Sequence, residues 1–253
     1  MMIDTVIFDM GGTIEQLSYT DEERLRCKKR IQRELIKASA VFDIPFEVFE
    51  RSLMDGYSAY KLWSTGAEIE CRTEEIWADW YLRDFPQARQ AVVPLAAFLS
   101  EIWETTFYTR SLRPEAKALL DYLEEQGYKQ GVISNTSSCT QPYRSMEEYG
   151  IRSYFACVLL SAAEGSRKPA PAMFEKACRL LGSQPERCMY VGDQIGKDVL
   201  GARRAGYGAN VLIGSDFTVA DDKDAPLVDY RVQELTQIIP VLEKIGVRRP
   251  VRV

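Results

Sequence analysis

Short apolar runs that end at a polar residue or a glycine recur along this chain and alternate with helix-like stretches. The runs lie at residues 5–8, 131–133, 156–160, 188–191 and 209–213. A last short strand and helix are expected at 228–232 and 235–245. Runs of this length between helices are typical of buried parallel strands whose connecting helices cover both faces of a sheet. The sequence therefore predicts an α/β fold with a Rossmann-like parallel sheet.

A helical insert interrupts this alternation over residues 17–109, where strand signals are weak. Thr20 and Glu23 match a capping box at the start of a helix. Further helices are expected near residues 45–62, 73–82 and 94–107. The aromatic side chains of this stretch are expected to form a small core of their own. We therefore expect an all-α domain over 17–109, inserted into a core domain made of residues 1–16 and 110–253.

Composition and charge exclude several classes of function. The net charge of −5 and the pI near 5.1 give no general attraction to nucleic acid or to an anionic membrane. No apolar run approaches the length of a membrane span, and the start of the chain does not resemble a secretion signal, so we expect a cytoplasmic protein. The chain contains no histidine, which excludes histidine-based triads and histidine-ligated zinc. Acid–base chemistry must therefore come from other side chains.

Polar side chains stop three of the apolar runs: Asp9, Ser134 and Asp193. Ligands of such sheets bind beyond the carboxyl ends of the strands, so these side chains are expected to lie together. Lys168, in a Lys-Pro step before a helix, and Asp198 complete the set. Each acid taken alone could be an ordinary cap of a turn or a helix. Together the five offer carboxylates for Mg²⁺, a hydroxyl and a lysine for phosphate oxygens, and a carboxylate able to attack phosphorus.

Four segments resemble, in order and in strand context, the motifs of the haloacid-dehalogenase superfamily. They are residues 6–13 (VIFDMGGT), 132–135 (VISN), 167–169 (RKP) and 191–198 (VGDQIGKD). Any one motif is weak, but four in order are specific, and they span the whole expected core. The resemblance implies that the insert is a helical cap between the first and second motifs. It also implies a Mg²⁺-dependent phosphatase that acts on a small phosphorylated metabolite.

The resemblance assigns roles residue by residue. The implied catalytic residues are Asp9 as nucleophile, Ser134 and Lys168. The implied substrate contacts come from Met10, Gly11, Ser134, Asn135 and Lys168. The implied Mg²⁺ ligands are Asp9, the Gly11 carbonyl, Asp193 and Asp198. These roles agree with the preference of Mg²⁺ for oxygen ligands and with the use of a carboxylate as a covalent nucleophile.

One position departs from the pattern of the superfamily. Its phosphatases carry a second Asp two residues after the nucleophile, as general acid and base, whereas this chain has Gly11. A positioned acid–base group contributes about 10²–10⁴-fold, so ester hydrolysis is expected to be slow unless another group substitutes. Glu15 and Tyr19 are near enough in sequence to be considered.

Three functions remain open at this point. The first is a phosphatase with a weakened or replaced acid. The second is similar to phosphonoacetaldehyde hydrolase, which breaks a C–P bond by using a cap lysine as a Schiff base; the available lysines are Lys28, Lys29, Lys37 and Lys61. The third is a non-catalytic member that binds a phosphorylated ligand. The halide-removing branch fits poorly because it typically has tyrosine in place of Gly11. The retained nucleophile, hydroxyl, lysine and metal-site acids favour an active enzyme.

Overall fold

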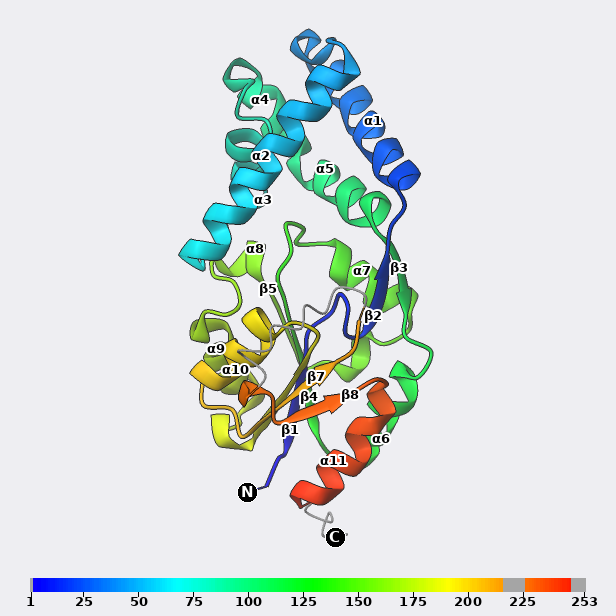
Figure 1. Ribbon diagram of the computed structural model, residues 1–253, viewed down its shortest axis with the longest axis vertical. Helices are drawn as coiled ribbons and strands as arrows, with labels where there is room; N and C mark the ends of the chain where they lie inside the picture. Colours follow the sequence, from blue (N-terminus) through cyan, green and yellow to red (C-terminus); the bar gives the residue numbers. More distant parts are fainter. Residues whose placement is uncertain (1, 216–225, 247–253) are drawn as a thin grey trace.

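A six-stranded sheet forms the centre of the computed structural model, which describes residues 2–215 and 226–246 (Figure 1). The strand order is β5-β4-β1-β6-β7-β8, and every neighbouring pair is parallel. The strands are β1 (Thr5–Phe8), β4 (Lys129–Ser134), β5 (Cys157–Leu160), β6 (Cys188–Gly192), β7 (Ala209–Ile213) and β8 (Tyr230–Val232). The predicted α/β fold with a Rossmann-like parallel sheet is therefore confirmed.

Helices cover both faces of the sheet because the side chains of its strands point alternately to each face. Val6 and Phe8 of β1 pack into one hydrophobic cluster, whereas Ile7 packs into another on the opposite face. Helices α6 (Ala116–Glu125), α7 (Gln141–Glu148) and α11 (Ile238–Ile245) contribute to the first cluster. Helix α9 (Pro171–Leu181) and the short α10 (Leu200–Arg204) contribute to the second. A further short helix, α8 (Ser161–Glu164), follows β5.

The insert is helical, as predicted, and has its own core. Its helices are α1 (Asp21–Ala38), α2 (Phe46–Ala67), α3 (Thr73–Glu75), α4 (Arg89–Val92) and α5 (Ala96–Ile102), and α3 and α5 continue as the π-helical segments Ile76–Tyr81 and Trp103–Phe107. The capping box at Thr20 and Glu23 is present. Helix α2 runs beyond the predicted residue 62 and ends where Glu68 takes a left-handed conformation, with φ of 56°.

A two-stranded antiparallel ribbon joins the insert to the core and was not predicted. It pairs β2 (Glu15–Ser18) with β3 (Thr109–Leu112). Each strand has only four residues, and most of these residues are partly or fully exposed, so neither strand has the apolar pattern of a core strand. The expected domain boundaries, after residue 16 and before residue 110, fall inside this ribbon. Residues 216–225 and 247–253 of the expected core domain lie outside the described residues.

The insert stands over the carboxyl ends of the strands (Figure 1) and is bonded to the core there. The backbone of Ile69 pairs with that of Ser166, and the Arg167 N–H donates to the Glu68 carbonyl at 3.2 Å. Glu70 and Arg167 form an ion pair of 3.5 Å across this contact, and both side chains are buried. A buried pair of this kind favours one relative placement because separating it would leave a charge unpaired.

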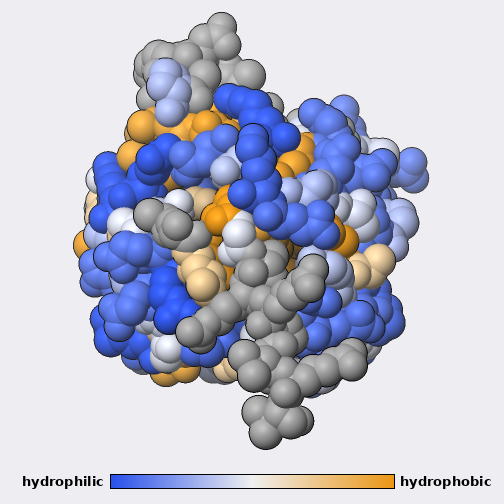
Figure 2. Space-filling model, turned by 90° about the horizontal axis from the view of Figure 1, so that it is seen from below, coloured by the Kyte–Doolittle hydropathy of each residue, from blue (hydrophilic) through white to orange (hydrophobic). Residues whose placement is uncertain are grey.

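The surface at the opposite end of the molecule, where the N-terminus lies, is mainly hydrophilic among the described residues (Figure 2). Small apolar areas show between the polar side chains, as on most proteins. None of the described helices combines the length and the apolar character that crossing a membrane requires. The apolar surface of the chain is thus buried mainly in the clusters of the core and of the insert.

Candidate active site

The residues predicted to form a site line one cavity between the carboxyl edge of the sheet and the insert. Strand β1 lies between β4 and β6, so the residues at the ends of these three strands are neighbours. The cavity has a volume of about 180 Å³. The predicted residues that line it are Asp9, Met10, Gly11, Ser134, Asn135, Lys168, Asp193 and Asp198. Pockets for drug-sized ligands typically measure about 300–1,000 Å³, so this cavity suits a small ligand.

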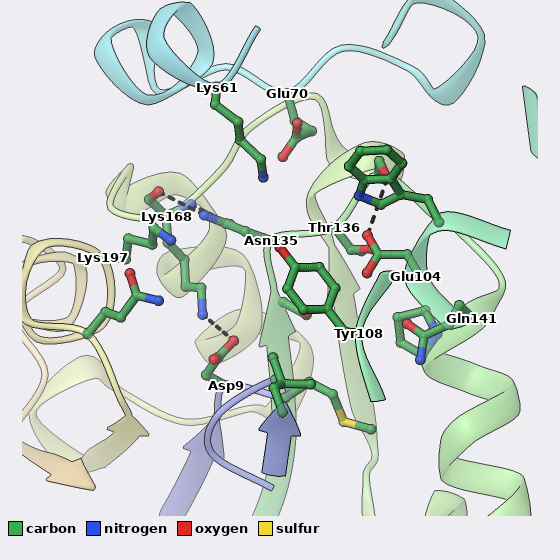
Figure 3. Close-up of a pocket in the computed structure, with 18 of the residues that line it drawn as sticks. Asp9, Lys61, Glu70, Glu104, Tyr108, Asn135, Thr136, Gln141, Lys168 and Lys197 are labelled. Atoms are coloured by element: carbon green, nitrogen blue, oxygen red, sulfur yellow. Dashed lines mark hydrogen bonds and ion pairs between the residues drawn. The ribbon is translucent and has the colours of Figure 1, made fainter. Parts of the chain in front are cut away.

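Three carboxylates and one ammonium group converge at the sheet edge of this cavity. Asp9, Asp193 and Asp198 each offer an oxygen atom, and these atoms lie within 4.8 Å of one another. The Lys168 Nζ donates to Asp9 Oδ1 at 2.6 Å (Figure 3) and to Asp198 Oδ1 at 2.7 Å. All four side chains are buried. Such a concentration of buried charge is stable only where the charges are closely paired.

Burial, and then the excess of negative charge, determine the pKa values of this cluster. Burial raises the pKa of Asp9 to about 6, with Lys168 opposing and Asp198 adding to the effect. Burial and the charges of Asp9 and Asp198 raise the pKa of Asp193 to about 7. Burial would lower the pKa of Lys168, but Asp198 and Asp9 outweigh it, so the pKa lies above its ordinary value. The cluster therefore favours additional positive charge.

One oxygen of the cluster is positioned for a cation. Asp193 Oδ1 is buried and has no hydrogen-bond partner among the described residues, whereas Oδ2 accepts from the Ser215 hydroxyl at 2.7 Å. A buried, unpaired carboxylate oxygen is costly unless a cation binds it. Carboxylate oxygens of this kind are typical ligands of Mg²⁺. The donor set of the cluster thus fits a divalent cation.

The turn after β1 needs a glycine at position 12. Gly12 has φ of 92°, in the left-handed region, and a Cβ there would lie 2.3 Å from Asp193 Oδ2. The Arg113 guanidinium donates to the carbonyls of Gly12 at 3.0 Å and of Gly214 at 2.7 Å, which fixes the turn beside the loop after β7. The glycine therefore lets the first turn approach the Asp193 carboxylate closely.

Two predicted substrate contacts use their side chains elsewhere. Asn135 Oδ1 accepts from the Lys168 N–H at 2.9 Å, and its Nδ2 donates to the Lys168 carbonyl at 3.0 Å. Its amide thus holds the backbone of the lysine rather than reaching freely into the cavity. The Met10 side chain is 1% exposed and belongs to the core, so only its backbone is placed for contact with a ligand.

Tyr190 supports Lys168 in a way that the sequence did not indicate. Its hydroxyl accepts from Lys168 Nζ at 3.0 Å and donates to the Ile133 carbonyl at 3.1 Å. The tyrosine lies in the middle of the apolar run of β6, which was predicted only as a buried strand. Its hydroxyl fixes the ammonium group from the side of the sheet.

The insert contributes a large part of the cavity wall, and almost none of it was predicted. Figure 3 shows Lys61, Glu70, Glu104 and Tyr108 around the space above Asp9. Glu70 accepts from Ser161 at 2.7 Å and also pairs with Arg167. The insert lacks a recognisable motif, so the sequence carried no signal for these positions apart from naming Lys61 among several lysines.

Of the four lysines considered for a Schiff base, only Lys61 lines the cavity. Lys28 pairs with Glu50, Lys37 pairs with Glu34, and the Lys29 ammonium lies 5.3 Å from the Phe46 ring centroid. Lys28, Lys29 and Lys37 all lie on α1, outside the cavity wall. Loss of hydration and the charge of Arg167 lower the pKa of Lys61.

Glu15 and Tyr19, considered as replacements for the missing acid, do not line the cavity. The Glu15 side chain is fully buried and accepts from Arg110 at 2.7 Å and from the Tyr149 hydroxyl at 3.1 Å. Tyr19 is 43% exposed and lies against the Arg24 guanidinium. Neither side chain is therefore placed to transfer a proton at Asp9.

Comparison with known proteins agrees with this geometry. The family model of haloacid dehalogenase-like hydrolases matches residues 3–206. A glyceraldehyde 3-phosphate phosphatase of Methanopyrus kandleri is 27% identical over 97% of this chain and 99% of its own length. The human N-acylneuraminate-9-phosphatase is 30% identical over 57% of each chain.

Solved structures share the fold. A HAD phosphatase of Thermococcus onnurineus matches with a TM-score of 0.63 and 22% identity, over 98% of this chain and 100% of its own. A 2-haloacid dehalogenase of Pseudomonas syringae matches with a TM-score of 0.67 and 20% identity, over 97% of this chain and 100% of its own. The four ordered motifs, the parallel sheet and the match to the family model together show that the chain belongs to the haloacid dehalogenase-like hydrolases.

Proposed function

We propose that this chain is a Mg²⁺-dependent phosphatase that hydrolyses a small phosphorylated metabolite through an aspartyl-phosphate on Asp9. The observation that carries the proposal is the buried cluster of Asp9, Asp193 and Asp198 around the Lys168 ammonium group, open to a small cavity. Relatives named as phosphatases of glyceraldehyde 3-phosphate and of an N-acylneuraminate support the substrate class. A cytoplasmic location, expected from the sequence, stays part of the proposal.

The reaction proceeds in two steps. A carboxylate oxygen of Asp9 bonds to phosphorus while the bond from phosphorus to the leaving oxygen breaks. Water then attacks phosphorus, the Asp9–phosphorus bond breaks, and phosphate leaves. Ser134, buried at the end of β4, donates its hydroxyl to a phosphate oxygen, and the Lys168 ammonium offsets the charge that Asp9 and the phosphoryl group bring together.

A bound Mg²⁺ would neutralise charge on the phosphoryl oxygens. Asp9, Asp193, Asp198 and the Gly11 carbonyl would hold it. The free Oδ1 of Asp193 and the excess of buried carboxylates over ammonium groups support this assignment.

We further propose that residues 17–109 act as a cap domain. Their separate hydrophobic cluster and their connection through the β2–β3 ribbon support this. The cap covers the carboxyl edge of the sheet and supplies part of the cavity wall. A cap that closes over the site excludes water from the reacting groups.

A screen of phosphate esters, acyl phosphates and phosphonoacetaldehyde, each with Mg²⁺ and with EDTA, tests the proposal. We expect Mg²⁺-dependent release of phosphate from at least one small phosphate ester and loss of that activity in EDTA. Release that is equally fast in EDTA would contradict the metal assignment. Activity on phosphonoacetaldehyde alone would replace the phosphatase with the C–P hydrolase.

With Gly11 in place of the second Asp, the described residues of the cavity include no free carboxylic acid at this turn to protonate the leaving group. The other carboxylates of the cavity are engaged, because Glu104 bonds with Arg110 and Glu70 with Arg167. Acyl phosphates and activated aryl phosphates have leaving groups that depart without a proton, so the first step should favour them. Hydrolysis of the aspartyl-phosphate would still lack its base, and a burst of product is expected.

Gly11→Asp is expected to raise turnover of alkyl phosphates by roughly tenfold or more. The backbone of Gly11 is outside the left-handed region, and an added Cβ would meet Leu17 Cδ1 at 3.2 Å, so a small shift of Leu17 suffices. The same Cβ would lie 3.5 Å from Arg110 Nη1, which would keep the new carboxylate ionised and limit the gain.

The matched control is Gly11→Asn, which has the same shape but cannot act as acid or base. Initial rates of both variants and wild type are measured on one alkyl and one activated aryl phosphate. We expect a higher rate only for Gly11→Asp on the alkyl ester. If wild type already turns over the alkyl ester at roughly tens per second, another residue donates the proton and this account of Gly11 fails.

A C–P hydrolase is the second candidate, because Lys61 lines the cavity and has a lowered pKa. A Schiff base requires a neutral amine, and a lowered pKa makes that form easier to reach. Under the phosphatase proposal we expect borohydride with phosphonoacetaldehyde to leave the protein active and its mass unchanged. Inactivation with a mass gain on Lys61, absent in Lys61→Arg, would favour the second candidate instead.

A further inference from the structure

Two ammonium groups of the cavity have no part in the proposed phosphoryl transfer. Lys61 lies on α2, and Lys197 lies in the π-helical turn Ile195–Val199 after β6. Neither ammonium group makes a hydrogen bond or an ion pair with a described residue. The other cations of the cavity wall, Arg110 and Lys168, are each bonded to two carboxylates. Lys61 and Lys197 therefore leave positive charge available to a ligand.

Contacts within the insert and one contact with the core fix the position of Lys61. Tyr60, its neighbour on α2, donates its hydroxyl to Glu70 and accepts from the Cys71 N–H at 3.0 Å. Ser64, one turn later, is bonded to Arg167 of the core. This part of α2 is thus held against the core, and Lys61 reaches from it into the cavity on the side opposite Asp9 (Figure 3).

The turn that carries Lys197 is fixed in a similar way. Asp198 Oδ2 accepts from the Gln194 N–H at 3.0 Å, and Oδ1 accepts from Lys168. Lys197 is partly buried and lines the same cavity as Lys61. Two like charges facing one small cavity are unfavourable in the free protein, and an anion between them would remove that cost.

We propose, on the basis of the phosphatase function, that Lys61 and Lys197 bind a second anionic group of the substrate. The substrate is then a phosphate monoester that also carries a carboxylate or a second phosphate. The phosphoryl group lies at Asp9, where Lys168 and Ser134 meet it, and the second anion lies towards Lys61 and α2. A cavity of about 180 Å³ leaves room for only a short connection between the two groups.

The experiment compares two three-carbon ligands that differ at one end. Glycerol 3-phosphate ends in a hydroxymethyl group, and 3-phosphoglycerate ends in a carboxylate. Their dissociation constants are measured by calorimetry with Mg²⁺ in the Asp9→Asn protein, where turnover is not expected. 1,3-Propanediol bisphosphate is the third ligand and distinguishes a second phosphate from a carboxylate. We expect one of the two doubly anionic ligands to bind at least about tenfold more tightly than glycerol 3-phosphate.

Lys61→Met and Lys197→Met should each reduce that affinity ratio by roughly tenfold, because each removes one charge while keeping a flexible, unbranched side chain only one atom shorter. Lys61→Arg and Lys197→Arg should largely retain it. Lys29→Met, on α1 and outside the cavity wall, is the matched control for the change in net charge and should keep the ratio.

A ratio near one in the parent protein overturns the inference, as does a ratio that neither Met variant changes. Equal losses for all three ligands would place the two lysines at the phosphoryl group and also overturn it. Failure of the phosphatase proposal is seen separately, as the absence of Mg²⁺-dependent turnover by wild type of any phosphate ester in the screen. The affinity ratio is measured in a protein that does not turn over substrate. Failure of the lysine proposal can therefore be distinguished from failure of the phosphatase proposal.

Discussion

Asp9→Asn is expected to abolish phosphatase turnover, with a loss of at least about 10⁴-fold, while the protein remains folded. The amide keeps the shape of the carboxylate and can still accept from Lys168 Nζ, which lies 2.6 Å from Asp9 Oδ1. It cannot form the acyl phosphate. Initial rates on an activated aryl phosphate, where the missing acid matters least, give the most sensitive measurement.

The stability of the variant separates chemistry from folding. Burial raises the pKa of Asp9 to about 6, so its charged form is disfavoured in the folded, metal-free protein. Replacing that charge with a neutral amide should therefore not lower the melting temperature in EDTA. Asp121→Asn is the matched control, because Asp121 is a partly exposed acid on α6, paired with Lys117, and lies outside the cavity wall. Activity of Asp9→Asn near the wild-type rate would place the nucleophile elsewhere.

Most strands of the core domain could be predicted because each one corresponds to a short, continuous apolar segment of the sequence. The runs at residues 5–8 and 209–213 are buried along their whole length, so each reads as an unbroken apolar segment. The β2–β3 ribbon could not be read in this way. Its strands are about ninety residues apart in sequence and largely exposed, and their pairing depends on where the folded insert brings them together.

The residues of the candidate site also fall into a group that local sequence patterns predict and a group that depends on long-range contacts. Asp9, Ser134 and Asp193 were predictable because each directly ends a buried strand, and parallel strands bring such ends to one edge. Glu15 illustrates what could not be predicted. Its partner Arg110 lies 95 residues further along the chain, and this ion pair withdraws Glu15 from proton transfer. The cavity residues of the insert depend on docking contacts of the same long-range kind.

Mg²⁺ is expected to bind more tightly as the pH rises from about 5.5 to 8, with release of protons. Metal ligation requires ionised carboxylates, and in the metal-free protein burial raises the pKa of Asp9 to about 6 and that of Asp193 to about 7. Calorimetry in two buffers with different ionisation enthalpies measures both the affinity and the number of protons released. Binding that is independent of pH over this range would contradict the assignment of these carboxylates as ligands.

The folding stability of the metal-free protein should fall as the pH rises, whereas its Mg²⁺ affinity should increase. A carboxyl group whose pKa is raised by folding binds protons more tightly in the folded state, so the folded protein loses stability as the pH rises from about 4 to 7. Below this range both states are protonated, and above it the loss is complete. Melting temperatures in EDTA should therefore fall over this range, and saturating Mg²⁺ should restore them because it binds only the folded protein.

Asp193→Asn tests both effects at one residue. The variant removes a ligand whose Oδ1 is buried without a partner among the described residues, so Mg²⁺ affinity should fall by roughly 10- to 100-fold and fewer protons should be released. Its metal-free melting temperature at pH 8 should rise, since the costly buried charge is gone. Asp121→Asn should change neither quantity. Unchanged Mg²⁺ affinity in Asp193→Asn would mean that the cluster of three acids is not the metal site.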